Sequence, residues 1–224
     1  MDPREQMDRM YRVQRHFYDF TREYYLLGRD EMLKQMHIRE GDQVLEVACG
    51  TARNLMRAVK IQPKAQYYGL DASAVMLETA EKKIAKSRIC AGKIVLKHEL
   101  AQDLTYSGTF GLNKPFDIIF FSYGLSMIPV WQEAIDAALL NLRPGGTMFI
   151  VDFWDQNDLP GVFRYGLKRW LKMFGVVHRP ELLVHLNGIS ESGVGTLSLQ
   201  SIRRRYAYLA RFEKNGVPRA AMAC

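Results

Sequence analysis

Short apolar runs alternate with longer segments of helical periodicity through the middle of the chain. The runs are rich in β-branched and aromatic residues, and between them apolar side chains recur every three or four positions, which predicts strands that alternate with helices. Such alternation is typical of an α/β fold with a parallel sheet covered by helices on both faces. We expect strands near residues 43–47, 66–70, 93–97, 116–121 and 147–151, and helices at residues 53–59, after Ser73 as N-cap, and at 131–142.

The two ends of the chain follow other patterns. Aromatic residues at helical spacing between residues 4 and 36, interrupted at Gly28, predict one or two helices that cap a ligand cleft. An apolar helix face with basic neighbours spans residues 163–174, a short helix is expected at 180–186, and residues 195–213 alternate like an antiparallel strand pair. We expect a single domain over residues 1–224, with a helical cap at 1–36, a cofactor-binding core at 41–155, substrate- or membrane-side helices and a strand pair at 156–213, and a flexible tail at 214–224.

The first two strands carry the clearest chemical signal. The first runs into a turn of small residues, and the second ends on the carboxylate of Asp71. Ligands of open α/β sheets bind at the carboxyl ends of strands, where an acid takes a ribose diol by two hydrogen bonds. The dinucleotide fingerprint needs three glycines, but its positions here are Ala48, Gly50 and Arg53, and no phosphate-loop motif is present. The pattern indicates a nucleoside cofactor without phosphates, such as S-adenosylmethionine (SAM).

The amino-acid composition narrows the class of protein but does not identify a binding partner. The 224 residues suffice for one sizeable core, and the proportions of 48% hydrophobic and 25% charged residues are ordinary for a globular protein. The net charge of +7 favours nucleic acid, anionic lipid or acidic substrates without choosing between them. The three cysteines and five histidines are scattered, which indicates reduced thiols, a cytoplasmic location and no metal site. We expect neither a signal peptide nor a membrane-spanning segment.

The turn after the first strand resembles the first motif of the class I SAM-dependent methyltransferases. That motif usually reads Glu/Asp-x-Gly-x-Gly-x-Gly, and residues 46–52 read Glu-Val-Ala-Cys-Gly-Thr-Ala, with alanine at two glycine positions. The resemblance implies a Rossmann-like, seven-stranded, mostly parallel sheet with a terminal antiparallel hairpin. Because alanine lacks the easy access of glycine to positive φ, we expect either a slightly different loop or negative φ at Ala48 and Ala52.

Four further segments resemble a narrower family, the bacterial betaine-lipid N-methyltransferases. They are Tyr11–Arg22, Tyr25–Asp30, Ser122–Trp131 and Val151–Gln156 with the following Leu159-Pro160. The resemblance extends from about Tyr11 to Arg211, and Ser-Tyr-Gly-Leu-Ser-Met-Ile-Pro is its most specific part. It implies methylation of the amino group of diacylglyceryl-homoserine, three times, to give diacylglyceryl-trimethylhomoserine.

The resemblance also implies roles for individual residues. Asp71 is expected on the ribose hydroxyls, and Glu46 is expected to orient the loop after the first strand. The relatives' adenine-binding Gly-Asp-Ala is replaced by Glu-Leu-Ala here, so the backbone at Leu100 and Ala101 is expected to read the adenine, with Asp103 as a weaker substitute. The full cofactor-binding set that we expect is Tyr18, Tyr25, Arg29, Glu46, Ala48, Cys49, Gly50, Thr51, Asp71, Ala72, Met76, Leu100, Ala101 and Ser122.

Methyl transfer is an in-line displacement, so the main task of the protein is to align acceptor, methyl carbon and sulfur. The aromatic faces of Tyr18 and Tyr25 are expected to cover the sulfonium, and Arg29 is expected to pair with the cofactor carboxylate. Aromatic packing between helices and a surface arginine fit the same residues equally well. An amine acceptor must lose a proton before each transfer. Tyr123, Asp152 and His16 are equal candidates for the base.

The expected partners are an amine-headgroup glycerolipid, an anionic membrane surface at the inner face of the membrane, and the enzyme that makes diacylglyceryl-homoserine. The basic helix at residues 163–174 suits such a surface, although a core-packed helix with a solvated basic rim fits the same pattern. Nucleic acid is not expected. The alternatives are methylation of phosphatidylethanolamine or another small amine, a basic nucleic-acid binder, and a non-catalytic SAM-binding protein.

Overall fold

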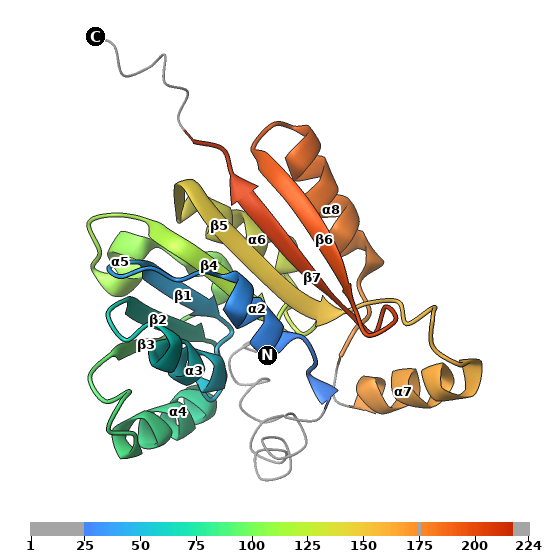
Figure 1. Cartoon of the computed structure of the whole chain (residues 1–224), viewed down its shortest axis with the longest axis horizontal. Helices are drawn as coiled ribbons and strands as arrows, with labels where there is room; N and C mark the ends of the chain where they lie inside the picture. Colours follow the sequence, from blue (N-terminus) through green and yellow to red (C-terminus); the bar gives the residue numbers. More distant parts are fainter. Residues whose placement is uncertain (1–24, 174–175, 217–224) are drawn as a thin grey trace.

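The computed structural model describes residues 25–173 and 176–216 and contains a seven-stranded sheet in the order β3-β2-β1-β4-β5-β7-β6 (Figure 1). The first five strands in the chain pair in parallel, and the last two pair antiparallel at one edge. This arrangement confirms the predicted Rossmann-like sheet with its terminal hairpin. The strands are β1 (Gln43–Val47), β2 (Gln66–Asp71), β3 (Ile94–His98), β4 (Phe116–Ser122), β5 (Leu142–Phe153), β6 (Gly195–Ile202) and β7 (Ala207–Lys214).

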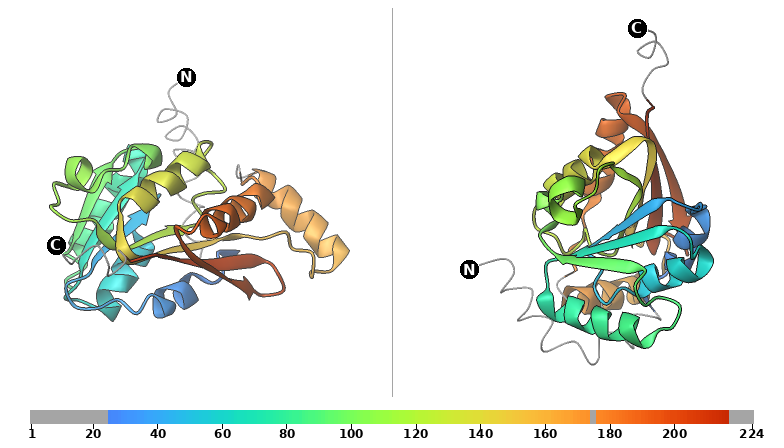
Figure 2. Two further views of the ribbon diagram at one scale, coloured as in Figure 1. Left: turned by 90° about the horizontal axis from the view of Figure 1, so that it is seen from above. Right: turned by 90° about the vertical axis from the view of Figure 1, so that its left-hand side faces the viewer.

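Helices cover both faces of this sheet (Figure 2). One face packs against α2, α3 and α4 and against Leu171 of α7, and the other packs against η1, α5, α6 and α8. The helices are α2 (Arg29–Gln35), α3 (Arg53–Ile61), α4 (Ala74–Lys86), η1 (Ala101–Asp103), α5 (Tyr106–Phe110), α6 (Trp131–Leu140), α7 (Gly161–Met173) and α8 (Pro180–Glu191). Neither η1 nor α5 was predicted from the sequence.

The predicted start of α4 is confirmed in detail. Ser73 is its N-cap, and the Ser73 hydroxyl accepts a hydrogen bond of 3.3 Å from the amide of Met76. The buried residues of the helix are the four predicted ones, Met76, Leu77, Ala80 and Ile84. Capping and the apolar stripe together account for the position and rotation of this helix.

The boundary between α6 and β5 differs from the expectation. The helix ends at Leu140 rather than at residue 142, and β5 begins at Leu142, five residues earlier than predicted. The reason is pairing, because Phe116 of β4 lies opposite Leu142 and its amide donates to the carbonyl of Asn141. A register shift between Phe116 and Ile118 accommodates the Pro-Gly-Gly sequence within the strand.

The ends of the chain are only partly described. Of the expected helical cap, α2 is present and follows Gly28, which has a φ of 83° and forms the N-cap. The flexible tail was expected from residue 214, but Lys214 is the last residue of β7 and its Nζ donates to the carbonyls of Leu139 and Leu142. The rest of the cap before residue 25 and the chain after residue 216 lie outside the described residues. Among the described residues, no helix combines the length and apolarity that crossing a membrane requires.

Candidate functional site

A cavity of about 430 Å³ lies at the carboxyl ends of β1, β2 and β4. This position is the usual ligand site of an open α/β sheet, and the volume is within the range of small-molecule sites. Its lining includes two sets of residues, which we call walls and which meet at Ala48 and Gly124. The β1–β2 wall consists of Ala48, Cys49, Gly50, Thr51, Asp71 and Ala72, and the β4–α6 wall consists of Ser122, Tyr123, Gly124, Met127, Ile128, Pro129 and Val130.

Asp71 holds the β1–β2 wall together. Its Oδ2 accepts a hydrogen bond of 2.7 Å from the amide of Gly50, and its Oδ1 accepts one of 2.9 Å from the amide of Ser73. The side chain is buried, yet it lines the cavity. A carboxylate has about four acceptor positions, so Asp71 can fix the loop and still accept hydrogen bonds from a ribose.

The loop after β1 has backbone angles of the kind that glycine adopts easily. Ala48, Gly50 and Ala52 have φ angles of 58°, 54° and 59°, so all three motif positions are left-handed. Of the two alternatives expected for the alanines, negative φ was therefore wrong. A methyl group added at Gly124 would lie 2.9 Å from the Cβ of Ala48, which shows that the second wall leaves room for the alanine of the first.

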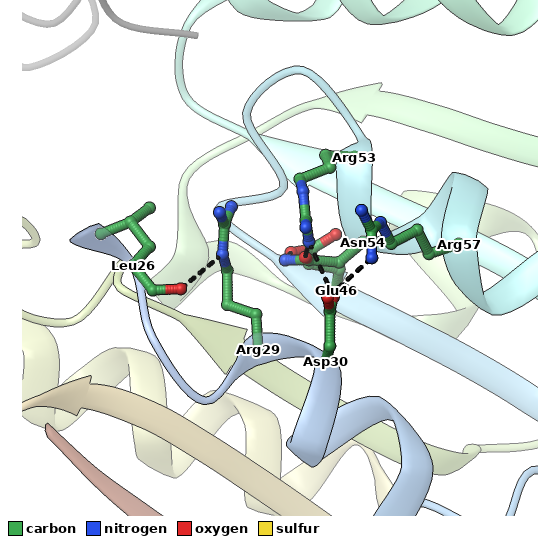
Figure 3. A network of polar contacts seen from close by, with 7 residues as sticks. All are labelled: Leu26, Arg29, Asp30, Glu46, Arg53, Asn54 and Arg57. Atoms are coloured by element: carbon green, nitrogen blue, oxygen red, sulfur yellow. Dashed lines mark hydrogen bonds and ion pairs between the residues drawn. The ribbon is translucent and has the colours of Figure 1, made fainter. Parts of the chain in front are cut away.

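Glu46 lies beneath the loop, on the face of β1 that packs against α2 and α3 (Figure 3). Its Oε1 accepts a hydrogen bond of 2.7 Å from Asn54, whereas Oε2 has no hydrogen-bond partner among the described residues. Burial raises the pKa of Glu46 from 4.5 to about 8, against smaller lowering effects from Asn54 and the guanidinium of Arg29. Glu46 and Arg29 both line the cavity. The carboxyl group of Glu46 can therefore exchange a proton with a ligand bound there.

Basic side chains gather on the same side of the cavity. Arg29 is buried and donates through Nε to the carbonyl of Leu26 at 3.0 Å. Arg53 and Arg57 both pair with Asp30, at 3.2 Å and 2.6 Å (Figure 3). These two arginines and Lys83 line the cavity but were not expected there, because residues spaced along two amphipathic helices look like ordinary surface cations in the sequence.

The segment between β3 and η1 closes the end of the cavity beyond Asp71. Leu100 and Ala101 line it as expected, and Gln102 joins them, whereas Asp103 is exposed and is absent from the described lining. The carboxylate of Glu99 accepts a hydrogen bond of 3.0 Å from the amide of Leu100. Leu100 stands where the relatives of the resemblance carry an aspartate, and Gln102, two residues on, adds an amide side chain to this end of the cavity.

The β4–α6 wall is mostly apolar. Ser122 supplies a buried hydroxyl that has no hydrogen-bond partner among the described residues. Tyr123 has a φ of 56°, and its hydroxyl donates to the carbonyl of Leu27 at 2.6 Å. Burial raises the pKa of Tyr123 well above its usual range, so the phenol remains protonated. A protonated phenol that already donates its hydrogen is suited to holding α2 against this wall.

Asp152 supports this wall from the opposite face of the sheet. Its neighbours Val151 and Phe153 pack on the α2 and α3 face, so strand alternation turns Asp152 toward α6 and α8. There its Oδ2 accepts a hydrogen bond of 3.0 Å from the amide of Ser126. Burial raises the pKa of Asp152 to about 6, although two backbone amides donate to it.

A second contact fixes the same loop. Arg179, which precedes α8, donates through Nη2 to the carbonyl of Ile128 at 3.1 Å, and the amide of Val177 donates to the carbonyl of Ser126. Arg179 also lowers the pKa of Asp152 through its charge. The loop from Gly124 to Val130 is thus anchored by groups that are distant in the sequence.

The expected site residues divide into three groups. Arg29, Glu46, Ser122, Tyr123 and the expected residues of the β1–β2 wall and of the β3–η1 segment come together around the cavity. Asp152, Met76 and Tyr25 are absent from its described lining; Met76 is in the core, and the ring of Tyr25 packs edge-on against Trp170 at 4.7 Å. His16 and Tyr18 lie outside the described residues, so their roles stay predictions.

The described part of the chain contains no cluster of metal-binding side chains. No group of three or more His, Cys, Asp or Glu side chains there could hold a metal ion. Cys49 and Cys90 are buried free thiols, and burial raises the pKa of Cys49 well above its usual range. Cys49 therefore contributes a neutral wall to the cavity rather than a nucleophile.

Comparison with known proteins agrees with this geometry. Residues 38–187 match the family model described as a methyltransferase domain. A demethylmenaquinone methyltransferase of Listeria monocytogenes serotype 4a (strain HCC23) is 27% identical over 184 residues, which cover 82% of this chain and 71% of that protein. A demethylmenaquinone methyltransferase of Halalkalibacterium halodurans is 30% identical over 125 residues, covering 55% of this chain and 48% of that protein.

Solved structures with the same fold include the plantazolicin methyltransferase BpumL in complex with a monoazolic desmethylPZN analog and SAH. It has a TM-score of 0.70 at 12% identity and covers 95% of each chain. The putative methyltransferase complexed with the Haloferax volcanii Trm112 activator has a TM-score of 0.71 at 13% identity, covering 94% of this chain and 98% of that one. At these identities the likeness supports the fold alone.

Proposed function

The chain belongs to the methyltransferase domain family, and we propose that within this family it methylates the amino group of a glycerolipid. It is a SAM-dependent methyltransferase, and the acceptor that we propose is diacylglyceryl-homoserine, converted in three steps to diacylglyceryl-trimethylhomoserine. The observation that carries this proposal is the position of Ser122–Val130. The segment with the most specific resemblance to betaine-lipid N-methyltransferases lines the same cavity as the cofactor motif and lies next to it at Gly124.

The residues of the cavity fit SAM. Asp71 is suited to the ribose, and the loop backbone from Ala48 to Thr51 is suited to the methionine part. Glu46 Oε2 and Ser122 Oγ are buried polar atoms without partners among the described residues, a condition that a bound polar ligand would relieve. When bound, SAM supplies an activated methyl group, so no nucleophilic side chain is required of the protein.

The surroundings of the cavity favour the neutral form of an amine. Desolvation lowers the pKa of an ammonium group, and nearby positive charges lower it further. Arg29, Arg53 and Lys83 line the cavity, while the raised pKa of Glu46 keeps much of that group uncharged near neutral pH. In the first two methylations the deprotonated amine still carries an N–H group that can donate a hydrogen bond to Ser122 Oγ. The same cations would attract the carboxylate of a homoserine headgroup.

The relatives favour a second candidate function. Their name, demethylmenaquinone methyltransferase, indicates methylation of a quinone in those proteins. A lipid quinone would also suit the apolar side chains of Met127, Ile128 and Val130. Phosphatidylethanolamine, whose headgroup joins an amine to an anionic phosphate, is the nearest alternative among amine acceptors.

Lipid analysis in cells distinguishes these acceptors. We would express the chain in a host that lacks betaine lipids, with and without the enzyme that makes diacylglyceryl-homoserine, and record mass spectra of the lipid extract. Our proposal predicts that one, two and three methyl groups are added to the homoserine lipid, only when both enzymes are present and not with Asp71→Ala. Accumulation of unmethylated homoserine lipid beside soluble, SAM-binding protein would contradict it, and methylated quinone or phosphatidylethanolamine would identify the acceptor instead.

A further inference from the structure

We infer that the edge of the molecule formed by α7 and the β6–β7 turn is the surface by which the protein docks on an anionic membrane. This inference rests on the proposed lipid acceptor and extends it to the way that acceptor is reached. In Figure 1 the turn lies at the carboxyl end of β5, from which the chain continues into α7. The register agrees, because Phe153 near the end of β5 pairs with Ala207 at the start of β7.

The turn itself presents two arginines to solvent. Arg203, Arg204 and Arg205 have φ angles of 46°, 56° and 57°, so three consecutive non-glycine residues are left-handed. Such residues cost about 1–2 kcal/mol each and persist only where the surroundings hold them. Arg203 and Arg204 are exposed, and Arg205 is partly buried.

Arg205 is the anchor that holds this turn in place. It forms a two-pronged ion pair with Asp155, and its guanidinium lies 4.4 Å from the ring centre of Trp154. Its carbonyl accepts a hydrogen bond of 2.9 Å from the amide of Gln156, and the amide of Trp154 donates to the carbonyl of Tyr206. The turn is therefore fixed to the segment that leads into α7, so the two basic features form one unit.

The helix α7 adds exposed apolar side chains to this unit. Val162 and Tyr165 are 90% and 71% exposed, and Val162 is the most exposed large hydrophobic residue among those described. With Arg169, which is also exposed, they follow the spacing of a single helix face. The opposite face is anchored to the protein, because Leu171 is buried and Trp170 packs on Tyr25.

The chemistry of this edge fits a bilayer surface. Exposed apolar side chains beside arginines match the interface of anionic lipids, where apolar groups insert and cations remain at the phosphates. This edge also carries two acidic residues. Arg205 neutralises Asp155, whereas Asp158 is exposed to solvent. The cavity opens at the same carboxyl edge of the sheet, and Val177, 50% exposed, bonds to the loop that lines it. A headgroup in the bilayer would thus face the cavity.

The test is flotation of the full chain with vesicles of phosphatidylcholine alone or mixed with phosphatidylglycerol. We expect binding to the mixed vesicles, and binding about thirtyfold weaker for Arg203→Asn with Arg204→Asn, since each basic residue contributes about 1 kcal/mol near an anionic surface. Asparagine tolerates left-handed φ, so the turn should keep its shape. Arg203→Lys with Arg204→Lys keeps both charges and should retain binding to the mixed vesicles. Val162→Ser with Tyr165→Ser should weaken this binding about tenfold.

Matched controls change the same kinds of side chain at the opposite edge. Lys86→Ser with Arg88→Ser removes two exposed cations, one at the last residue of α4 and one just after it. Leu140→Ser removes a side chain that is 79% exposed at the end of α6. Both should bind mixed vesicles like the unmodified protein, and all variants should keep its SAM affinity. Controls that lose binding as much as the Arg203 and Arg204 variant would overturn the inference.

The outcomes also separate this inference from the proposed acceptor. Methylation of a lipid amine in detergent micelles without any vesicle binding would overturn the docking surface alone. Vesicle binding that depends on these side chains, without methylation of any lipid amine, would overturn the acceptor and support the surface. Binding to a homopolymeric RNA that requires Arg203 and Arg204 but not Val162 and Tyr165, without vesicle binding, would replace the membrane by nucleic acid.

Discussion

The two walls of the cavity are built in different ways. The β1–β2 wall is held by one of its own residues, because the carboxylate of Asp71 accepts hydrogen bonds from the amides of Gly50 and Ser73. The β4–α6 wall is held by residues outside the cavity lining, since Asp152 and Arg179 bind the backbone at Ser126 and Ile128. The first wall is mainly backbone and one acid, whereas the second is mainly apolar side chains.

This difference indicates how a common fold combines one cofactor with many acceptors. A wall that depends on a short loop and one strand-end carboxylate changes little when the rest of the chain diverges. A wall whose loop is positioned from β5 and from the segment before α8 can change shape through substitutions far from the ligand. The two walls should therefore respond separately to mutation, except where they touch at Ala48 and Gly124.

The largest expected effect is on the β1–β2 wall. Asp71→Ala removes the expected hydrogen bonds to the ribose and the acceptor of the Gly50 amide, so kcat/KM for SAM should fall about a hundredfold or more. Initial rates at varied SAM and saturating acceptor measure this. Asp117→Asn is a suitable control, because it changes a partly buried carboxylate at the other end of the strands. Equal losses in both variants would show that the effect is general destabilisation.

The contact between the walls is tested by moving one methyl group. Gly124→Ala would place its Cβ 2.9 Å from that of Ala48 and should lower the free energy of unfolding by about 2 kcal/mol. Adding Ala48→Gly should restore most of this loss, since the methyl group then has space. Denaturant unfolding of the single and double variants gives the coupling energy. If Gly124→Ala costs the same in both backgrounds, the walls do not meet at this point.

A smaller effect is expected from the support of the β4–α6 wall. Asp152→Asn keeps the shape of the side chain but can accept from only one of the two backbone amides that now donate to it. We expect kcat/KM for the acceptor to fall about tenfold while the Kd for SAM stays unchanged. Steady-state kinetics with the methyl acceptor measure the first quantity. A parallel loss of SAM affinity would show that the walls are not independent.

Glu46 beneath the β1–β2 wall should make stability depend on pH. Burial raises its pKa from 4.5 to about 8, so the folded state holds this proton more tightly than the unfolded state. The contribution of Glu46 to stability is therefore full below pH 4.5 and is lost as the pH rises toward 8. Glu46→Gln cannot titrate, so its stability relative to the unmodified protein should increase by about 1 kcal/mol or more over this window.

Unfolding by denaturant at several pH values measures this difference. The raised pKa of Asp152 acts in the same direction in both proteins and largely cancels from the comparison. A relative stability of Glu46→Gln that decreases as the pH rises would contradict the assignment.

The smallest effect concerns the strained loop. Ala52→Gly relieves a φ of 59° at the N-cap of α3 and should raise the free energy of unfolding by about 0.5 kcal/mol, strain relief being partly offset by unfolded-state entropy. Ala58→Gly in the same helix should instead destabilise the protein by about 1 kcal/mol. Thermal or denaturant unfolding measures both. Destabilisation by Ala52→Gly would mean that the left-handed residue carries no strain.

The sequence predicted the β1–β2 wall well, because strand periodicity and one acid at a strand end mark it. Periodicity placed β1 at Gln43–Val47, and the acid at the tip of β2 indicated the ligand edge. Backbone angles could not be predicted, since tertiary contacts hold Ala48 and Ala52 at positive φ against their own preference. The four residues of the α4 core face were predicted because capping and periodicity agree.

The supports of the β4–α6 wall were not predictable in the same way. Asp152 was expected as one of three candidates for the base, but alternation along β5 turns it to the face of the sheet that packs against α6 and α8. That alternation could have been counted from the sequence. The contact of Arg179 with Ile128 gives no sequence signal, because it joins segments 51 residues apart. The positions of Arg53, Arg57 and Lys83 at the cavity likewise depend on how two helices pack.

The most direct test of the separate walls is calorimetric titration of SAM into the unmodified protein, Asp71→Ala and Asp152→Asn. We predict that the unmodified protein and Asp152→Asn bind SAM with the same Kd, and that Asp71→Ala binds about a hundredfold more weakly. Unchanged SAM affinity in Asp71→Ala would contradict the assignment of the β1–β2 wall to the cofactor, and with it the account of the cavity.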